Sequence, residues 1–144
     1  MKPEETVDYN VKVCWHAISR MYNTQAAQYG ITTSIGFVLL NINPEEGTPA
    51  TKIAPLLGLE SRSLTRILKS MEEDGFIYRE ADKQDKRSVR IFLTKQGLEK
   101  KEIARQTVRH FNKKVQEQIP EEQLQTFFKV ISRINRMIDN KEIY

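Results

Sequence analysis

Apolar residues recur every three or four positions over most of the chain, which is the spacing of amphipathic helices. A first helix is predicted over residues 6–28, where Gly30 ends it, and a shorter one begins near residue 33. Two further helices are predicted beyond Thr94, one running to about residue 118 and one beginning at Pro120. The first of the four carries the apolar residues Val7, Val11, Cys14, Ile18 and Met21.

The middle of the chain changes its pattern twice. Two short helices are predicted over residues 51–57 and 62–74, with Gly58 as the corner between them. The period then becomes two over residues 76–80 and 89–93, which predicts a pair of strands around a polar loop. Two helices joined through a tight turn and followed by a hairpin are typical of a winged helix-turn-helix.

The predicted fold is therefore mainly α with a small β-hairpin wing. Residues 31–94 are predicted to form the winged helix-turn-helix DNA-binding domain. Residues 1–30 and 95–144 are predicted to form a helical dimerisation region, because their apolar stripes are more than one small chain is expected to cover. A homodimer is the simplest solution.

Composition adds limits to this picture. The 23 Lys and Arg residues exceed the 19 Asp and Glu residues by four, and the isoelectric point is about 9.2. This excess is mild, so the placement of the charges decides whether a polyanion is a partner. Cys14 stands alone and forms no intrachain disulfide, and no apolar run is long enough to span a membrane, which predicts a cytoplasmic protein without a membrane partner.

The second helix of the motif begins with a polar, basic segment. In a helix-turn-helix this end lies in the major groove, where Arg bonds guanine and Ser or Thr bonds bases or phosphates. A solvated helix face is the plainer interpretation of the same residues. The candidate DNA-binding residues here are Ser61, Arg62, Ser63, Thr65, Arg66 and Lys69.

The hairpin places further positive charge around a polar loop. Lys83, Lys86, Arg87 and Arg90 are candidate DNA-binding residues, because arginine side chains enter the narrow and electronegative minor groove. An ordinary exposed turn is the alternative. A basic helix and a basic wing within about 35 residues of each other favour double-stranded DNA as the partner.

The wing carries Asp85-Lys86-Arg87, then a strand ending in Leu93-Thr94, then Gly97. This signature resembles that of the MarR family of winged-helix regulators. The segment from Leu64 to Ile77 is similar to the family's recognition helix and exit. The resemblance implies that Arg87 enters the minor groove, that Asp85 orients a wing arginine by an ion pair, and that the terminal helices build a dimer. It also implies a small-molecule pocket between the dimer helices and the DNA-binding lobe.

Two sets of residues near the amino terminus carry alternatives. Cys14 is a possible redox site, although its position on the apolar stripe favours an inert core residue. Trp15, Tyr22 and Phe37 are a possible pocket for a small aromatic or anionic ligand, although packing is the favoured role. No metal site is predicted, no cofactor is expected, and no catalytic motif is present.

The function predicted from the sequence is a sequence-specific, double-stranded DNA-binding transcriptional regulator that is not an enzyme. It is expected to be a dimeric repressor on a palindromic operator, released by a small molecule. One alternative is a thiol redox switch through Cys14. Another is a winged helix used only to bind proteins, which the arginines of the recognition helix and wing disfavour.

Overall fold

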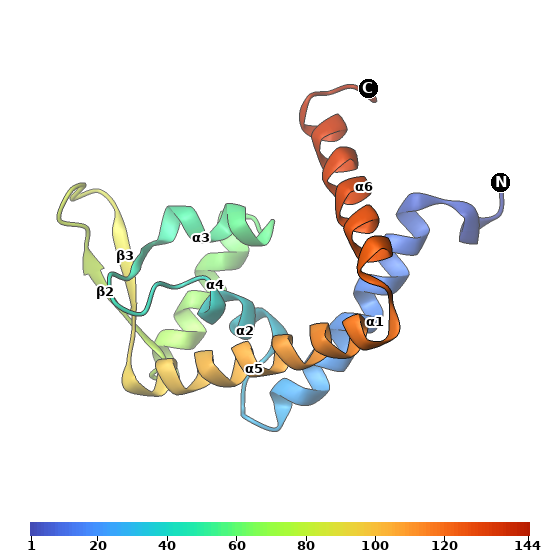
Figure 1. Ribbon diagram of the computed structural model, residues 1–144. Helices are drawn as coiled ribbons and strands as arrows, with labels where there is room; N and C mark the ends of the chain where they lie inside the picture. The colour runs from blue at the N-terminus through green and yellow to red at the C-terminus, as the bar shows by residue number, and fades with distance from the viewer. The chain divides into compact units, whose positions relative to one another are not determined.

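The computed structural model describes all 144 residues and divides into two compact units, residues 1–107 and 108–144. The predicted fold class is confirmed, since six α-helices accompany a small antiparallel sheet (Figure 1). The elements in chain order are η1 (Pro3–Glu5), α1 (Val7–Ala27), α2 (Thr33–Leu40), β1 (Thr48–Pro49), α3 (Ala50–Leu57), α4 (Ser61–Glu73), β2 (Ile77–Ala81), β3 (Val89–Leu93), α5 (Lys95–Gln118) and α6 (Glu121–Asp139).

The junction of α1 and α2 is held by side chains that cap backbone groups. The Thr32 hydroxyl accepts the backbone N–H of Ile35 at 3.1 Å and so caps the start of α2. Asn23 in α1 uses its side-chain carbonyl oxygen to accept both the N–H of Thr33, at 3.1 Å, and the hydroxyl of Thr33, at 2.6 Å. These bonds fix the first turn of α2 against α1.

Helices α3 and α4 form the helix-turn-helix. Gly58, with φ +63°, adopts the left-handed conformation that ends α3, which a residue with a side chain adopts only under strain. The N–H of Leu59 donates to the carbonyl of Ala54 at 3.0 Å and closes the turn. The chain then re-enters helix at Ser61, one residue earlier than the pattern predicts.

The sheet has three strands in the order β1-β3-β2, all antiparallel. Tyr78 faces Phe92 across β2 and β3, and their rings stack with centroids 5.4 Å apart. The short strand β1 pairs Thr48 with Ile91 and was not predicted, because two residues are too few to show a period. It brings the loop after α2 to the base of the wing.

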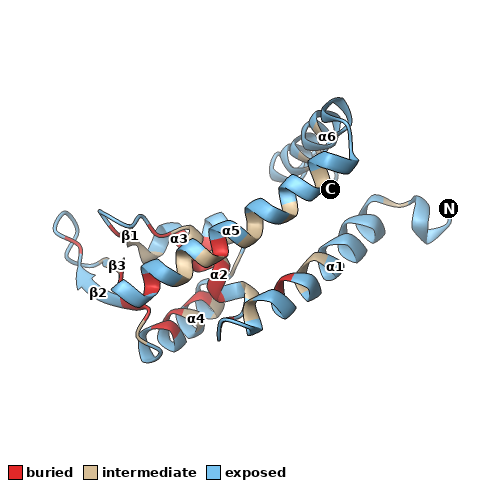
Figure 2. Cartoon of the chain, turned by 60° about the horizontal axis from the view of Figure 1, so that its bottom comes forward, coloured by how far each residue is buried: buried red, intermediate tan, exposed pale blue.

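The core lies among α2, α3, α4 and the strands, where the buried residues gather in Figure 2. Because these side chains come from α2, α3, α4, β2 and β3, the core fixes how the recognition helix and the wing are presented. Side chains without measurable exposure include Val38, Leu39, Ile42, Ile53, Met71 and Ile91.

The passage from β3 into α5 explains the Leu-Thr and Gly signature of the wing. The Thr94 hydroxyl donates to the Gly75 carbonyl at 2.6 Å and accepts the N–H of Gly97 at 3.0 Å, so it joins the end of α4 to the start of α5. A Cβ at position 97 would lie 2.0 Å from the Phe76 carbonyl oxygen. Only glycine fits there.

Helix α5 also contacts the end of α2 through hydrogen bonds from a lysine. The Lys101 ammonium donates to the carbonyls of Ile42, at 2.6 Å, and Leu40, at 3.3 Å. Partial burial, with a smaller contribution from the charge of Arg105, lowers the pKa of Lys101 below its ordinary value. Lys101 therefore stabilises the fold, although the charged residues around it in the sequence are typical of a solvent-exposed helix face.

The unit of residues 108–144 holds the end of α5 and all of α6. None of its residues is buried, although α6 carries a row of large apolar side chains. Phe127 and Phe128 are 55% and 50% exposed, and Ile138 is 56% exposed. No helix in the chain is both long enough and apolar enough to cross a membrane.

Candidate nucleic-acid interface

The amino-terminal half of α4 presents a basic face to solvent. Its inner face is fixed because Leu64, Leu68 and Met71 are buried in the core. The outward positions are therefore Arg62, Thr65, Arg66 and Lys69, together with Ser61, and all five are exposed. Ser63, also a predicted DNA-binding residue, is half-buried.

The cations on this face are free of partners within the chain. Arg62, Arg66 and Lys69 take part in no ion pair and no side-chain hydrogen bond. Thr65 differs, because its hydroxyl donates to the carbonyl of Ser61 at 2.8 Å. Three uncompensated cations on one face of a helix are suited to bind phosphates or base edges.

The tip of the wing is shaped by two aspartates that bond to the backbone. Asp82 accepts the N–H of Gln84 at 2.9 Å, and Asp85 accepts the N–H of Arg87 at 3.0 Å. The N–H of Ser88 then donates to the Asp85 carbonyl at 2.9 Å. These bonds hold a compact loop from which the side chains of Lys83, Lys86 and Arg87 extend, exposed and unpaired.

Arg90, also predicted to bind DNA, differs from this exposed group because its guanidinium has partners within the chain. Its guanidinium donates through Nη1 to the carbonyls of Glu46, at 3.0 Å, and Gly47, at 3.3 Å. Its Nη2 lies 3.5 Å from the Asp82 carboxylate. The side chain is half-buried because β1 and its loop lie beside β3, a pairing that the sequence pattern does not reveal.

The role of Asp85 also needs correction. The resemblance implies an ion pair between Asp85 and a wing arginine, but Asp85 forms no ion pair and instead caps the backbone N–H of Arg87. Asp82 makes the ion pair, with Arg90, and is the one buried charged residue of the chain. The pKa of Asp82 is lowered, chiefly by the Gln84 hydrogen bond and then by the charge of Arg90, while burial opposes this shift.

An ion pair ties the wing to the recognition helix. Arg79 on β2 donates from Nε to the Glu72 carboxylate near the end of α4 at 3.1 Å. Each side chain keeps more than a third of its surface exposed, so the pair contributes little stability. It does restrict how β2 turns relative to α4.

Cys14 is exposed, which corrects the expectation of an inert core residue. The beginning of the apolar stripe that it shares is not covered by its own chain, because Val7 is 57% exposed and Val11 is 48% exposed. A stripe of apolar residues shows which face avoids water, and the covering partner need not be the same chain. The exposure of Cys14 follows from that.

The three aromatic residues predicted as a ligand pocket lie together. The ring centroids of Trp15 and Phe37 are 6.1 Å apart, and those of Tyr22 and Phe37 are 6.0 Å apart in an edge-on arrangement. A cleft of about 490 Å³ opens beside Trp15 and Phe37. Tyr22 is buried behind Phe37 and does not line the cleft, and this burial raises the pKa of its hydroxyl.

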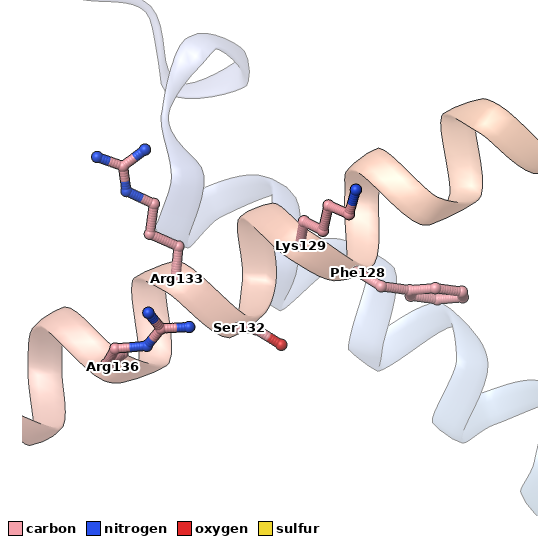
Figure 3. A pocket seen from close by; sticks show the side chains of 5 residues that line it. All are labelled: Phe128, Lys129, Ser132, Arg133 and Arg136. Carbon is pink, nitrogen blue, oxygen red and sulfur yellow. The ribbon is translucent and has the colours of Figure 1, made fainter.

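A second hollow, of about 610 Å³, follows one face of α6 (Figure 3). It is lined by Phe128, Lys129, Ser132, Arg133 and Arg136, which project from successive turns of the helix. The three cations form no ion pair within the chain. No group of three or more His, Cys, Asp or Glu side chains is placed to hold a metal ion.

Comparison with known proteins identifies the family of this chain. The model of the MarR family matches residues 31–89, the segment from the start of α2 to the first residue of β3. The transcriptional regulator SarZ of Staphylococcus saprophyticus is 31% identical over 115 residues, which cover 76% of this chain and 79% of SarZ. The chain belongs to the MarR family.

Other relatives vary in how much they share. The regulator TtmR of Methylorubrum extorquens is 39% identical over 82 residues, which cover 57% of this chain and 42% of TtmR. The chain spans about half the length of several curated relatives that it matches, with shares of 42% and 54%. These relatives are named as HTH-type transcriptional regulators, a class of proteins that are not enzymes.

The solved structures agree on the fold. The MepR protein of Staphylococcus aureus, solved as a complex with DNA, superposes with a TM-score of 0.83 at 22% identity. The superposition covers 91% of this chain and 97% of the MepR chain. The two chains therefore share a fold over this length.

Proposed function

We propose that this MarR-family chain is a transcriptional regulator that binds double-stranded DNA in a sequence-specific way. The observation that carries the proposal is the set of unpaired, exposed cations on two elements of a winged helix. One group lies on α4, with Arg62, Arg66 and Lys69, and the other lies at the wing tip, with Lys83, Lys86 and Arg87. The complex of MepR with DNA supports the proposal by analogy.

Each group has its own task in this proposal. Helix α4 enters the major groove, where Arg62 and Arg66 bond guanine edges and Ser61 and Thr65 reach bases or phosphates. The wing enters the minor groove, where Arg87 responds to groove width and negative potential. Lys69, Lys83 and Lys86 add phosphate contacts that raise affinity for any sequence.

The proposal includes a homodimer built by residues 1–30 and 95–144, with residues 31–94 as the DNA-binding domain. Support comes from the uncovered apolar side chains of α1 and α6, since a stable protein rarely leaves such a surface in water. A two-fold dimer presents two recognition helices to a palindromic operator with half-sites about one helical turn apart. We propose that the protein is cytoplasmic.

The sign of regulation is proposed as repression that a small molecule relieves. The 490 Å³ cleft beside Trp15 and Phe37 is the candidate ligand site, and its volume lies within the range of about 300–1,000 Å³ usual for such sites. It borders the turn that leads into α4. No cofactor is proposed.

Selection of bound duplexes from a random library tests the DNA-binding proposal. The parent protein is expected to enrich one inverted-repeat sequence. Arg62→Ala with Arg66→Ala should abolish the enrichment. Arg133→Ala with Arg136→Ala removes the same charge from α6 and should leave it intact. Absence of any enriched sequence from the parent protein would contradict the proposal and favour a protein-interaction module.

A further inference from the structure

The cleft between α1, α2 and the end of α3 is lined only by uncharged residues. Two aromatic residues, Trp15 and Phe37, form one wall, and Leu56, Leu57 and Leu59 form another. The polar lining residues are Ser19, Asn23, Thr33 and Ser34. No Lys, Arg, His, Asp or Glu lines the cleft.

The helix ends at the cleft supply only partial charges and no full positive charge. Helix α2 begins there, where the N–H of Thr33 is taken by Asn23 and the N–H of Ile35 by Thr32, so Ser34 has the one N–H of this turn without an acceptor in the chain. Helix α3 ends there, and the carboxyl end of a helix carries partial negative charge. A carboxylate in the cleft would therefore meet no cationic side chain to replace the water that it gives up, only the partial charge of the first turn of α2.

The polar groups that remain suit a neutral ligand. The Asn23 side-chain oxygen already accepts two hydrogen bonds from Thr33, while its Nδ2 amide makes none within the chain. The hydroxyls of Ser19 and Ser34 make no hydrogen bond within the chain. One amide donor and two hydroxyls, each both donor and acceptor, match a ligand such as a carboxamide that carries both kinds of group.

We propose that the cleft binds an uncharged aromatic molecule with a carboxamide-like polar end, and that it discriminates against aromatic carboxylates. The aromatic part lies against Trp15 and Phe37, and the polar end meets Asn23, Ser19 and Ser34. This deepens the proposed function, since it names the class of ligand that acts on the regulator, and it narrows the expected aromatic or anionic ligand to a neutral one.

The cleft is placed to act on DNA binding. Leu56, Leu57 and Leu59 lie on the end of α3 and the turn that precedes Ser61, the first residue of the recognition helix. Leu56 is 65% exposed, so it moves with little loss of packing. A ligand wedged between Phe37 and these leucines shifts the turn and, with it, the start of α4.

A matched pair of probes, naphthamide and naphthoate, tests the class of ligand. They share a ring system and shape and differ in charge. Trp15 is the only tryptophan in the chain, so its indole N–H gives a single resonance that reports on the cleft. Titration of the full chain with naphthamide should shift this resonance saturably, and naphthoate should bind at least tenfold more weakly. Equal or tighter binding of naphthoate would overturn the inference.

Two variants separate the site from the rest of the protein. Ser34→Lys adds a cation at the cleft and should reverse the preference toward naphthoate, whereas Ser70→Lys, on the exposed side of α4, should not change it. Failure of both probes to shift Trp15 would also overturn the inference. Duplex binding measured on the same samples without a probe keeps the two proposals apart, because sequence-specific binding that persists leaves the regulator proposal standing.

Discussion

The Arg90 guanidinium lies 3.5 Å from the buried carboxylate of Asp82 and joins the two ends of the wing loop. The same guanidinium reaches the carbonyls of Glu46 and Gly47, which belong to the loop before β1. The exposed cations of the tip are therefore carried on a base that is fixed to the body of the winged helix. The sequence predicts that Arg90 binds DNA, whereas in the structure Arg90 positions the exposed cations of the wing tip.

The first prediction separates these two kinds of wing arginine. Arg90→Ala should weaken DNA binding and also lower stability by more than the roughly 0.5 kcal/mol typical of surface changes, because it leaves Asp82 unpaired. Arg87→Ala should weaken DNA binding without a stability loss of that size. Urea unfolding and duplex titration of both variants provide the measurement. Equal stability of the two variants would argue against a positioning role for Arg90.

The second prediction concerns pH. Because the folded-state pKa of Asp82 lies below its ordinary value of about 3.9, its contribution to stability is present above about pH 4 and is lost as pH falls through the folded-state pKa. Asp82→Asn should therefore flatten the acid limb of the stability curve. Asp139→Asn, outside the wing, is the control. Thermal unfolding from about pH 5 down to about pH 2 measures the effect, and an unchanged acid limb in Asp82→Asn would refute it.

The third prediction concerns assembly. Phe127→Lys with Ile138→Lys places charges on the exposed apolar face of α6 and should convert a dimer at micromolar concentration into a monomer. Lys129→Ala serves as the control because it leaves the apolar residues in place. Light scattering gives the mass of each variant. A monomer mass for the parent protein at high concentration would defeat the dimer proposal.

The fourth prediction concerns Cys14. If the α1 stripe is covered in the dimer, the thiol should react slowly with an aromatic disulfide reagent in the parent protein and rapidly in the monomeric α6 variant. Cys14→Ser should bind DNA as the parent does, with or without peroxide. A peroxide response that disappears in Cys14→Ser would establish the redox switch instead.

Much of the fold follows from local pattern. The helix and strand periods locate α1, α4, β3 and α5 to within a residue or so, and Thr94 was recognisable as a cap because its hydroxyl can accept the N–H of Gly97. The outward residues of α4 were predictable too, since Leu64, Leu68 and Met71 fix the opposite face. These features depend on neighbours in sequence.

The residues that escaped prediction depend on contacts distant in sequence. Arg90 bonds to the carbonyls of Glu46 and Gly47, in the loop before β1. Because β1 is too short to predict from the sequence, these bonds could not be predicted either. Asp82 and Asp85 are alike in sequence, and only the closed loop decides which one meets an arginine. Cys14 shares an apolar stripe whose cover does not lie in its own chain.

The most direct test of the central claim is the ratio of affinities for the selected duplex and a random duplex, measured across several salt concentrations. For the parent protein the ratio should be large, and Arg62→Ala or Arg66→Ala should each lower it by about 1–3 kcal/mol, the discrimination that one bidentate arginine–guanine pair provides. Lys69→Ala should weaken both duplexes alike and flatten the salt slope by roughly one unit. A parent protein that binds both duplexes equally, or arginine variants that lose equally on both, would contradict sequence-specific recognition by α4.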